Sequence, residues 1–179
     1  GGALTSIATY GNAGCEPLNA ALKREQYDKP SMLANPWNPD EPRDLSLMVS
    51  QYLNYLQYFD WQWARSLRGT DTLFPPLRVL FTMLFTGLGV WGALEHRRRD
   101  TPSFWYMLVL FATLSVGLTF YLNFKYGYSI PSPQNDYRQH EVRERDYFFI
   151  VSFSVWGLWA GVGIAALWQA ARERLGSLS

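Results

Sequence analysis

The densest group of chemically active side chains lies at 140–147, where the sequence reads His-Glu-Val-Arg-Glu-Arg-Asp-Tyr. Alternating arginines and carboxylates can form an ion-pair network at a membrane surface, or hold an anionic substrate or a lipid headgroup. A solvated loop with salt bridges is the simpler interpretation. One histidine among scattered carboxylates does not supply the ligand set of a metal site, so we expect no metal centre here.

Other signals of catalysis or cofactor binding are missing from the sequence. The single cysteine, Cys15, has no partner for an intramolecular disulfide and no ligand-spaced neighbour for zinc. We find no phosphate-binding loop, no glycine-rich dinucleotide fingerprint and no nucleophile elbow. The formal net charge of +1 gives no bulk attraction to nucleic acid. We therefore identify no catalytic residue and expect no nucleic-acid partner.

The elements that position these residues are long apolar runs. The runs 104–124 and 148–168 contain no Asp, Glu, Lys or Arg, and 73–94 contains only Arg78. An uncharged run of about 20 residues is long enough to cross the hydrocarbon core of a bilayer. Buried helices of a large soluble core are the alternative, which fits poorly with three such runs in a short chain. We predict an all-α membrane protein with three transmembrane helices, at 73–94, 104–124 and 147–170.

An amphipathic helix is predicted at 45–68, before the first span. Asp44 is suited to cap its N-terminus. Apolar residues recur along it at steps of three and four: Leu45, Met48, Val49, Tyr52, Leu56, Phe59, Trp63 and Leu67. Three aromatic residues lie off this stripe: Tyr55, Tyr58 and Trp61. Such an aromatic belt suits the water–lipid interface, and a helix packed on a protein partner is the equally weighted alternative.

The distribution of arginines predicts the orientation of the chain. The basic loop 95–100 and the arginines of the tail 172–179 fall on the same side of a three-span chain. The positive-inside rule makes that side cytoplasmic, although the 125–146 loop also carries Lys125, Arg138, Arg143 and Arg145. The chain would then consist of an external region, 1–72, a three-span region, 73–171, and a cytoplasmic tail. Because a long external region needs help to cross, we expect an upstream hydrophobic segment and therefore a piece of a longer protein.

The spans offer no side chain that suits a pigment or metal. His96 and His140 fall in predicted loops, and the second and third spans contain neither histidine nor carboxylate. We therefore expect no cofactor bound by side-chain ligation, while peripheral contacts with pigment or lipid stay open.

Glycines predict close helix packing. Gly157 and Gly161 form a GxxxG step in the third span, which lets two helix backbones approach each other. Gly163 extends this smooth face, and Gly87, Gly89 and Gly92 offer a similar face on the first span. We predict that Gly157 and Gly161 pack against another helix, within the chain or in a partner.

Three stretches, 22–30, 51–59 and 143–147, together resemble a family of large bacterial multispan proteins. That family is a domain of unknown function similar to the protein O-mannosyltransferases of the GT-C class. The resemblance covers most of this chain but only a fraction of such a protein, and 143–147 is its most specific part. GT-C enzymes carry a catalytic acid in their first external loop, whereas the first loop here is short and basic. The resemblance implies a bacterial inner (cytoplasmic) membrane with region 1–72 periplasmic, and it carries over no catalytic residue.

We expect a non-catalytic accessory subunit that stabilises a larger membrane complex, with integral membrane subunits and lipids as partners. The whole chain also resembles an accessory subunit of a bacterial photosynthetic reaction-centre and light-harvesting complex, and this resemblance alone implies such a host. Two alternatives stay open. One is part of a GT-C-type enzyme that uses lipid-linked sugars, with Arg143, Arg145 and Asp146 near a phosphate. The other is a free-standing assembly or lipid-binding factor.

The partner-binding surface is expected where the 125–146 loop and the N-terminal region pack together. Aromatic and arginine side chains dominate the energetics of interfaces, while single exposed ion pairs contribute little. The candidate partner-binding residues are Trp37, Trp61, Trp63, Arg143, Arg145 and Asp146.

Overall fold

The computed structural model describes residues 31–67, 76–125, 140 and 143–176, and the regular elements among them are helical. In chain order they are α3 (Leu45–Ala64), η2 (Arg65–Leu67), α4 (Pro76–Arg99), α5 (Thr101–Ala112), η3 (Thr113–Gly117), α6 (Leu118–Leu122), η5 (Asp146–Phe149) and α7 (Ile150–Gly176). An isolated antiparallel bridge joins Ala34 and Pro42. The predicted all-α fold is confirmed for the described residues.

Three helical segments are long and apolar enough to cross a membrane: Pro76–Arg99, Thr101–Leu122 and Asp146–Gly176. At 1.5 Å per residue they measure about 33 to 47 Å, which exceeds the ~30 Å hydrocarbon core. Most of their apolar side chains point away from the rest of the chain, as lipid-facing residues do. The prediction of a membrane protein with three spans is confirmed.

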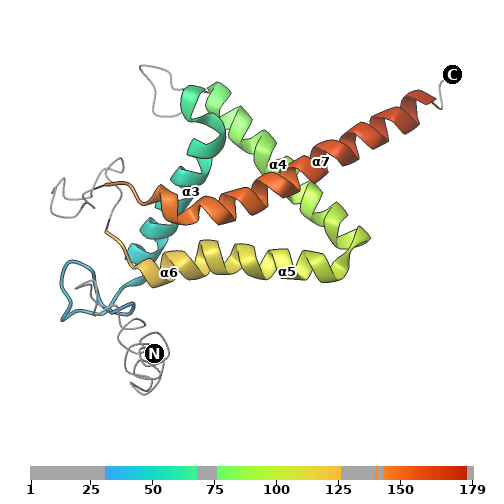
Figure 1. Cartoon of the computed structure of the whole chain (residues 1–179). Helices are drawn as coiled ribbons and strands as arrows, with labels where there is room; N and C mark the ends of the chain where they lie inside the picture. Colours follow the sequence, from blue (N-terminus) through green and yellow to red (C-terminus); the bar gives the residue numbers. More distant parts are fainter. Residues whose placement is uncertain (1–30, 68–75, 126–139, 141–142, 177–179) are drawn as a thin grey trace, which may run out of the picture.

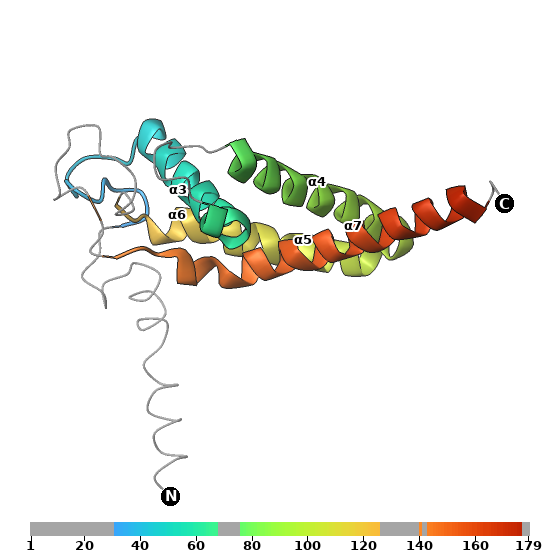
Figure 2. The ribbon, with the colours of Figure 1, turned by 90° about the horizontal axis from the view of Figure 1, so that it is seen from above.

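The spans share an orientation relative to α3. Toward the left of Figure 1, α4 and α7 begin and α6 ends, and we call this the α3 end of the molecule. α3 lies across this end and contacts both α4 and α6. Figure 2 shows that α7 extends beyond the other spans at the opposite end, where the C-terminus lies. The last turn of α7, which contains Arg172 and Arg174, is exposed.

The junction between the first two spans differs from the predicted loop 95–100. α4 continues through Arg99, and Asp100 alone separates it from α5. Glu95 pairs with Arg98 at 2.9 Å and with Arg99 at 3.6 Å, spacings that stabilise a helix. Asp100 then caps α5, because its Oδ1 accepts a hydrogen bond from the Ser103 amide at 3.2 Å. The basic residues therefore lie in the last helical turn, where positive charge suits the helix dipole.

α4 and α7 cross at glycines that leave no room for a side chain. A Cβ on Gly92 would lie 2.7 Å from the Gly163 amide nitrogen, and a Cβ on Gly89 would overlap the Trp156 indole. The two helices make the most extensive contact between described elements. In lipid, where helices gain little from hydrophobic burial, such close backbone approach is a main source of association.

The second span contains a π-helical turn, Thr113–Gly117, between α5 and α6. A π-turn moves backbone carbonyls away from their usual helical partners. Ser115 is buried and its Oγ donates to the Phe111 carbonyl at 2.6 Å, while the Tyr52 hydroxyl of α3 donates to the Val116 carbonyl at 3.0 Å. α3 therefore helps to satisfy the irregular part of this span.

Candidate functional site

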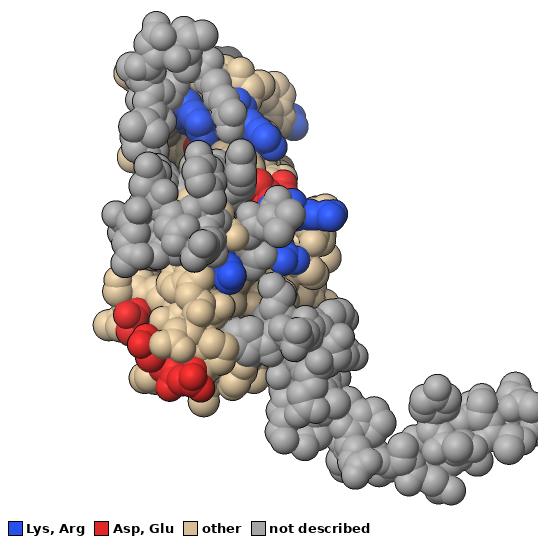
Figure 3. Space-filling view, turned by 90° about the vertical axis from the view of Figure 1, so that its left-hand side faces the viewer, with Lys and Arg blue, Asp and Glu red and all other residues tan. Residues whose placement is uncertain are grey.

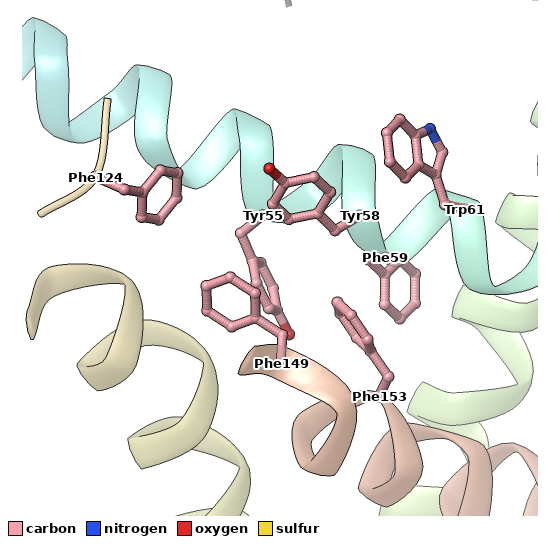
Figure 4. Close-up of a cluster of buried hydrophobic side chains, with 7 residues drawn as sticks. All are labelled: Tyr55, Tyr58, Phe59, Trp61, Phe124, Phe149 and Phe153. Carbon is pink, nitrogen blue, oxygen red and sulfur yellow. The ribbon is translucent and has the colours of Figure 1, made fainter. Parts of the chain in front are cut away.

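The inner face of α3 is aromatic. Figure 4 shows how its rings meet rings from the start of α7 and the segment after α6. The buried cluster consists of Tyr55, Tyr58, Phe59, Trp61, Phe124, Phe149 and Phe153. Tyr55 packs edge-on against Phe149, with ring centroids 5.0 Å apart, and stacks on Phe153 at 5.5 Å. Because aromatic pairs favour these geometries, the cluster fixes α3 against α7.

The outer face of α3 is aliphatic. Leu45 is 75% exposed, Val49 50%, Leu53 57% and Leu56 54%. These four residues, spaced so that they share one face of the helix, are called the outward stripe below. A contiguous apolar face that stays exposed in the described chain is typical of a surface that contacts lipid or another protein.

The helix itself was predicted correctly. Tyr55, Tyr58 and Trp61, for which the water–lipid interface and packing on protein were equally weighted, are buried within the chain. Both faces of α3 are apolar, so the spacing of apolar residues does not show which face is inward. Gln51 and Asn54 could have shown it: both are buried on the inner face, where such groups need hydrogen-bond partners.

Arg43, a residue that the sequence did not single out, ties the chain before α3 to the end of the second span. Its guanidinium is buried and donates to the carbonyls of Met32 at 3.1 Å and Phe120 at 2.8 Å, and to the Gln51 side chain. Gln51 in turn donates to the Phe124 carbonyl at 2.6 Å. A buried arginine is tolerated because several acceptors share its donors.

Asn123 completes this connection at the end of α6. Its φ of 39° places it in the left-handed region, which asparagine tolerates better than most residues and which ends a helix. Its Nδ2 donates to the carbonyls of Ser31 at 2.9 Å and Ala34 at 2.8 Å. Residues 31–43 are therefore fixed against the second span.

Tyr58 links α3 to the charged segment that precedes the third span. Its hydroxyl donates to Glu144 Oε2 at 2.6 Å and accepts from the Arg145 backbone amide at 3.2 Å. Burial, together with the nearby Glu144 carboxylate, raises the pKa of the Tyr58 phenol well above its ordinary value, so the phenol stays protonated and keeps its donor. The predicted contact between the N-terminal region and the 125–146 loop is present at this point.

Asp60 forms a third connection, from α3 to α4. Its carboxylate accepts from Arg78 Nε at 2.7 Å and from a second nitrogen of the same guanidinium, and also from Thr82 Oγ1 at 2.6 Å. The Arg78 and Asp60 side chains are only 13% and 21% exposed. The one charge in the first predicted span is therefore paired with α3.

The predicted tryptophans have internal contacts in this structure. Trp61 is buried beside Tyr58, and Trp63 stacks on Phe85 of α4 with ring centroids 4.8 Å apart. Trp37 is half-buried in the turn before α3, where its amide donates to Asn35 Oδ1 at 2.9 Å. Trp61 and Trp63 thus hold the chain together, and a role in partner binding stays a prediction.

The predicted charged residues lie together at the start of the third span. Arg143 is exposed, Arg145 is half-buried, and Asp146 begins η5. Their partner-binding role also stays a prediction, with Arg143 the most accessible of the three.

The predicted glycine pair is not the one that makes the close approach inside the chain. A Cβ on Gly161 would have nothing within 4 Å in the described chain, and one on Gly157 would meet the Trp63 ring at 3.5 Å. The internal crossing uses Gly92 and Gly163. Gly161 is therefore accessible to a helix of a partner, which was one of the two predicted alternatives.

His96 lies in the last turn of α4 and not in a loop. Its Nδ1 accepts a hydrogen bond from Trp159 Nε1 at 3.1 Å, and its Nε2 lies 3.0 Å from Ser103 Oγ. Because an indole only donates, Nδ1 carries no proton in this arrangement, and Nε2 is the donor to Ser103. His96 therefore joins α4, α5 and α7 at the end opposite α3.

Acidic side chains lie at the N-terminal end of the outward stripe. The exposed acids Asp40, Glu41 and Asp44 come directly before α3, and Figure 3 shows acidic side chains gathered at one edge of this end. An apolar centre with a polar rim is the usual arrangement of a protein interface.

Possible metal ligands are scattered among the described residues. Among them, no three His, Cys, Asp or Glu side chains come together as a metal ion would require. The Asp60, Glu144 and His96 side chains are each engaged in contacts between separate segments of the chain. No protein-family model, curated protein or solved structure matches this chain.

Proposed function

We propose that this chain is a non-catalytic subunit that stabilises a larger membrane complex, and that the outward stripe of α3 attaches it. The observation that carries the proposal is the contrast between the two faces of α3. The inner face is fixed by the aromatic cluster and by Gln51, Tyr58 and Asp60. The outer face presents four exposed aliphatic side chains.

A fixed apolar helix suits a protein interface for an energetic reason. A surface that is already ordered loses less conformational entropy on binding than a mobile one. The stripe from Leu45 to Leu56 extends about 16 Å along the helix, at 1.5 Å per residue. With the acids at 40–44 beside it, this surface resembles the apolar centre and polar rim of a subunit contact.

We further propose a bacterial inner membrane, with the α3 end in the periplasm and the C-terminus in the cytoplasm. Arg97, Arg98, Arg99 and Arg172 at the opposite end support this orientation by the positive-inside rule. Single cysteines at residues 40, 115 and 172 in a Cys15→Ser background would test it. A membrane-impermeant reagent added to intact cells should label residue 40 only. Labelling of residue 172 instead would show that the chain has the opposite orientation.

A photosynthetic reaction-centre and light-harvesting complex is the proposed host. The resemblance of the whole chain supports this host, and the lipid-facing aromatic residues could contact pigment at its periphery. Bacteriochlorophyll absorbance that co-purifies with the tagged chain is the expected result. A purified complex without pigment would reject this host while leaving the structural role intact.

Paired lysine substitutions test the attachment surface. Leu53→Lys with Leu56→Lys should remove the chain from its complex on native gels, because two charges would be buried in an apolar contact. Gln62→Lys is the control, since Gln62 is exposed on the same helix but lies on another face. Both variants should stay in the membrane fraction.

Three results would overturn the proposal. If the double lysine variant co-purifies at wild-type stoichiometry, attachment lies elsewhere, and Arg143→Ala with Arg145→Ala would test the charged segment next. If the wild-type chain migrates alone in mild detergent, a free-standing assembly or lipid-binding factor is favoured. The GT-C alternative would be favoured if the wild-type chain transferred sugar from a lipid-linked donor and the variant with Arg143→Ala and Arg145→Ala did not.

A further inference from the structure

A hollow of about 460 Å³ lies along the outer face of α4. Its lining residues in the described chain are Gly87, Val90, Trp91, Leu94, Glu95 and Arg98. By helical periodicity this face is opposite to Gly89 and Gly92, which pack on α7. The volume is in the range of sites that hold small molecules.

The body of the hollow is apolar and has room at its floor. A Cβ on Gly87 would meet nothing within 4 Å in the described chain, and Trp91 and Leu94 stand beside it, about half exposed. These residues belong to a membrane span, so the hollow opens toward lipid. An acyl chain could lie in it without displacing protein.

Charge is confined to one end of the hollow. Arg98 donates to Glu95 at 2.9 Å, but its side chain is 74% exposed and a guanidinium has further N–H groups to offer. Arg99 also pairs with Glu95, at 3.6 Å, while Arg97 lies over the Trp105 ring at 5.9 Å. Three arginines against the carboxylates of Glu95 and Asp100 leave this turn positive.

We propose that the hollow binds one anionic phospholipid, with its phosphate at Arg98 and an acyl chain along Val90, Trp91 and Leu94 over Gly87. The rise from Gly87 to Arg98 is about 16 Å at 1.5 Å per residue, close to one leaflet of a ~30 Å hydrocarbon core. An apolar channel of one leaflet's length with positive charge at the membrane surface matches a lipid better than a partner helix, which would run through both leaflets. Basic groups at the end of a span are known to select anionic headgroups.

Native mass spectrometry of the purified full-length chain tests the site. With phosphatidylglycerol and phosphatidylcholine supplied in equal amounts, the wild-type chain should retain phosphatidylglycerol preferentially. Arg98→Gln should weaken retention about five-fold, because one arginine near the surface contributes ~1 kcal/mol. Gly87→Leu should abolish the preference by filling the floor of the hollow. The site does not depend on the outward stripe of α3, so its failure and that of the proposed function are distinguishable.

Two matched variants separate this site from general lipid contact. Gly161→Leu adds the same side chain at another open glycine in a span, and Arg172→Gln removes an exposed arginine from the same end. Both should retain phosphatidylglycerol as the wild type does. Equal retention of the two lipids by the wild type, or an equal loss in Gly161→Leu and Gly87→Leu, would overturn the proposal. It would also be overturned if Gly87→Leu released a partner subunit but left lipid retention unchanged.

Discussion

Gly92 of α4 and Gly163 of α7 face each other across the crossing of the first and third spans. A Cβ on Gly92 would lie 2.7 Å from the Gly163 nitrogen, and a Cβ on Gly163 would lie 3.3 Å from the Gly92 nitrogen. The obstacle on each side is backbone, which cannot rotate away as a side chain can. The crossing distance of these helices therefore depends on both glycines.

Alanine at either glycine should loosen this crossing. We expect Gly92→Ala to lower the free energy of unfolding by about 1–3 kcal/mol, as other overpacked contacts do. The controls Gly87→Ala and Gly161→Ala place the new methyl in open space and should stay within about 0.5 kcal/mol of the wild type. The free energy of unfolding of the wild type and the three variants is measured by titrating dodecyl sulfate into micelles of a mild detergent. Equal destabilisation by Gly92→Ala and Gly161→Ala would contradict the crossing geometry.

The Asp60 contact should account for much of the attachment of α3 to α4. Asp60→Ala leaves Arg78 without its carboxylate in a mostly buried place, so we expect a loss of about 1–3 kcal/mol. Thr82→Val removes one hydrogen bond and should cost about 1 kcal/mol. Combining Asp60→Ala with Arg78→Gln in a double-mutant cycle should reveal a coupling energy above about 0.5 kcal/mol. Additive single effects would mean that the pair contributes nothing to stability.

Tyr58 should make stability depend on alkaline pH. Burial raises the pKa of its phenol in the folded chain above the ordinary value of 10.0. Below pH 10 the phenol is protonated in both the folded and the unfolded chain, so its contribution to the free energy of unfolding is fully present. This contribution is lost as the pH rises from there toward the pKa of the folded chain. Tyr58→Phe should flatten the decline in stability above pH 10, with the part due to Tyr55, whose pKa burial also raises, remaining. Unchanged slopes in chemical unfolding from pH 9 to 12 would show that Tyr58 is not buried in solution.

The same variant has a spectroscopic test. Absorbance titration of the folded wild-type chain minus that of Tyr58→Phe isolates one phenol among the 11 tyrosines. The difference should show ionisation above the ordinary tyrosine range. A difference curve centred at pH 10 would contradict the burial of the Tyr58 phenol beside Glu144.

Arg43 should control the order of the segment before α3. Arg43→Gln loses the charge and donors that reach the Met32 and Phe120 carbonyls, so residues 31–43 should become more susceptible to proteolysis. Arg43→Lys keeps the charge but has fewer, differently placed donors, and it should give an intermediate result. Limited proteolysis with mass-spectrometric identification of the cut sites measures the effect. Cleavage of Arg43→Gln at the wild-type rate would show that the network does not hold this segment.

The sequence by itself determined the spans and some of their boundaries. Length and lack of charge are local properties of 104–124 and 148–168, and in lipid a backbone must satisfy its own hydrogen bonds, so such runs become helices. Asp44 likewise acts locally: its Oδ1 accepts from the Leu47 amide at 2.6 Å and begins α3 where the sequence predicts. The junction at 95–100 was mispredicted as a loop because ion pairs between Glu95 and the following arginines extend the helix.

Only the tertiary structure decided how the helices face one another. Either face of α3 could have been buried, and the choice depends on Phe149 and Phe153, about 90 residues further along the chain. The close glycine approach lies at Gly92 and Gly163 instead of Gly157 and Gly161, because a crossing point depends on where two separate helices meet and not on the spacing within one. A sequence pattern specifies which surfaces a helix can offer, and packing between distant segments determines which of them remain available for a partner or a lipid.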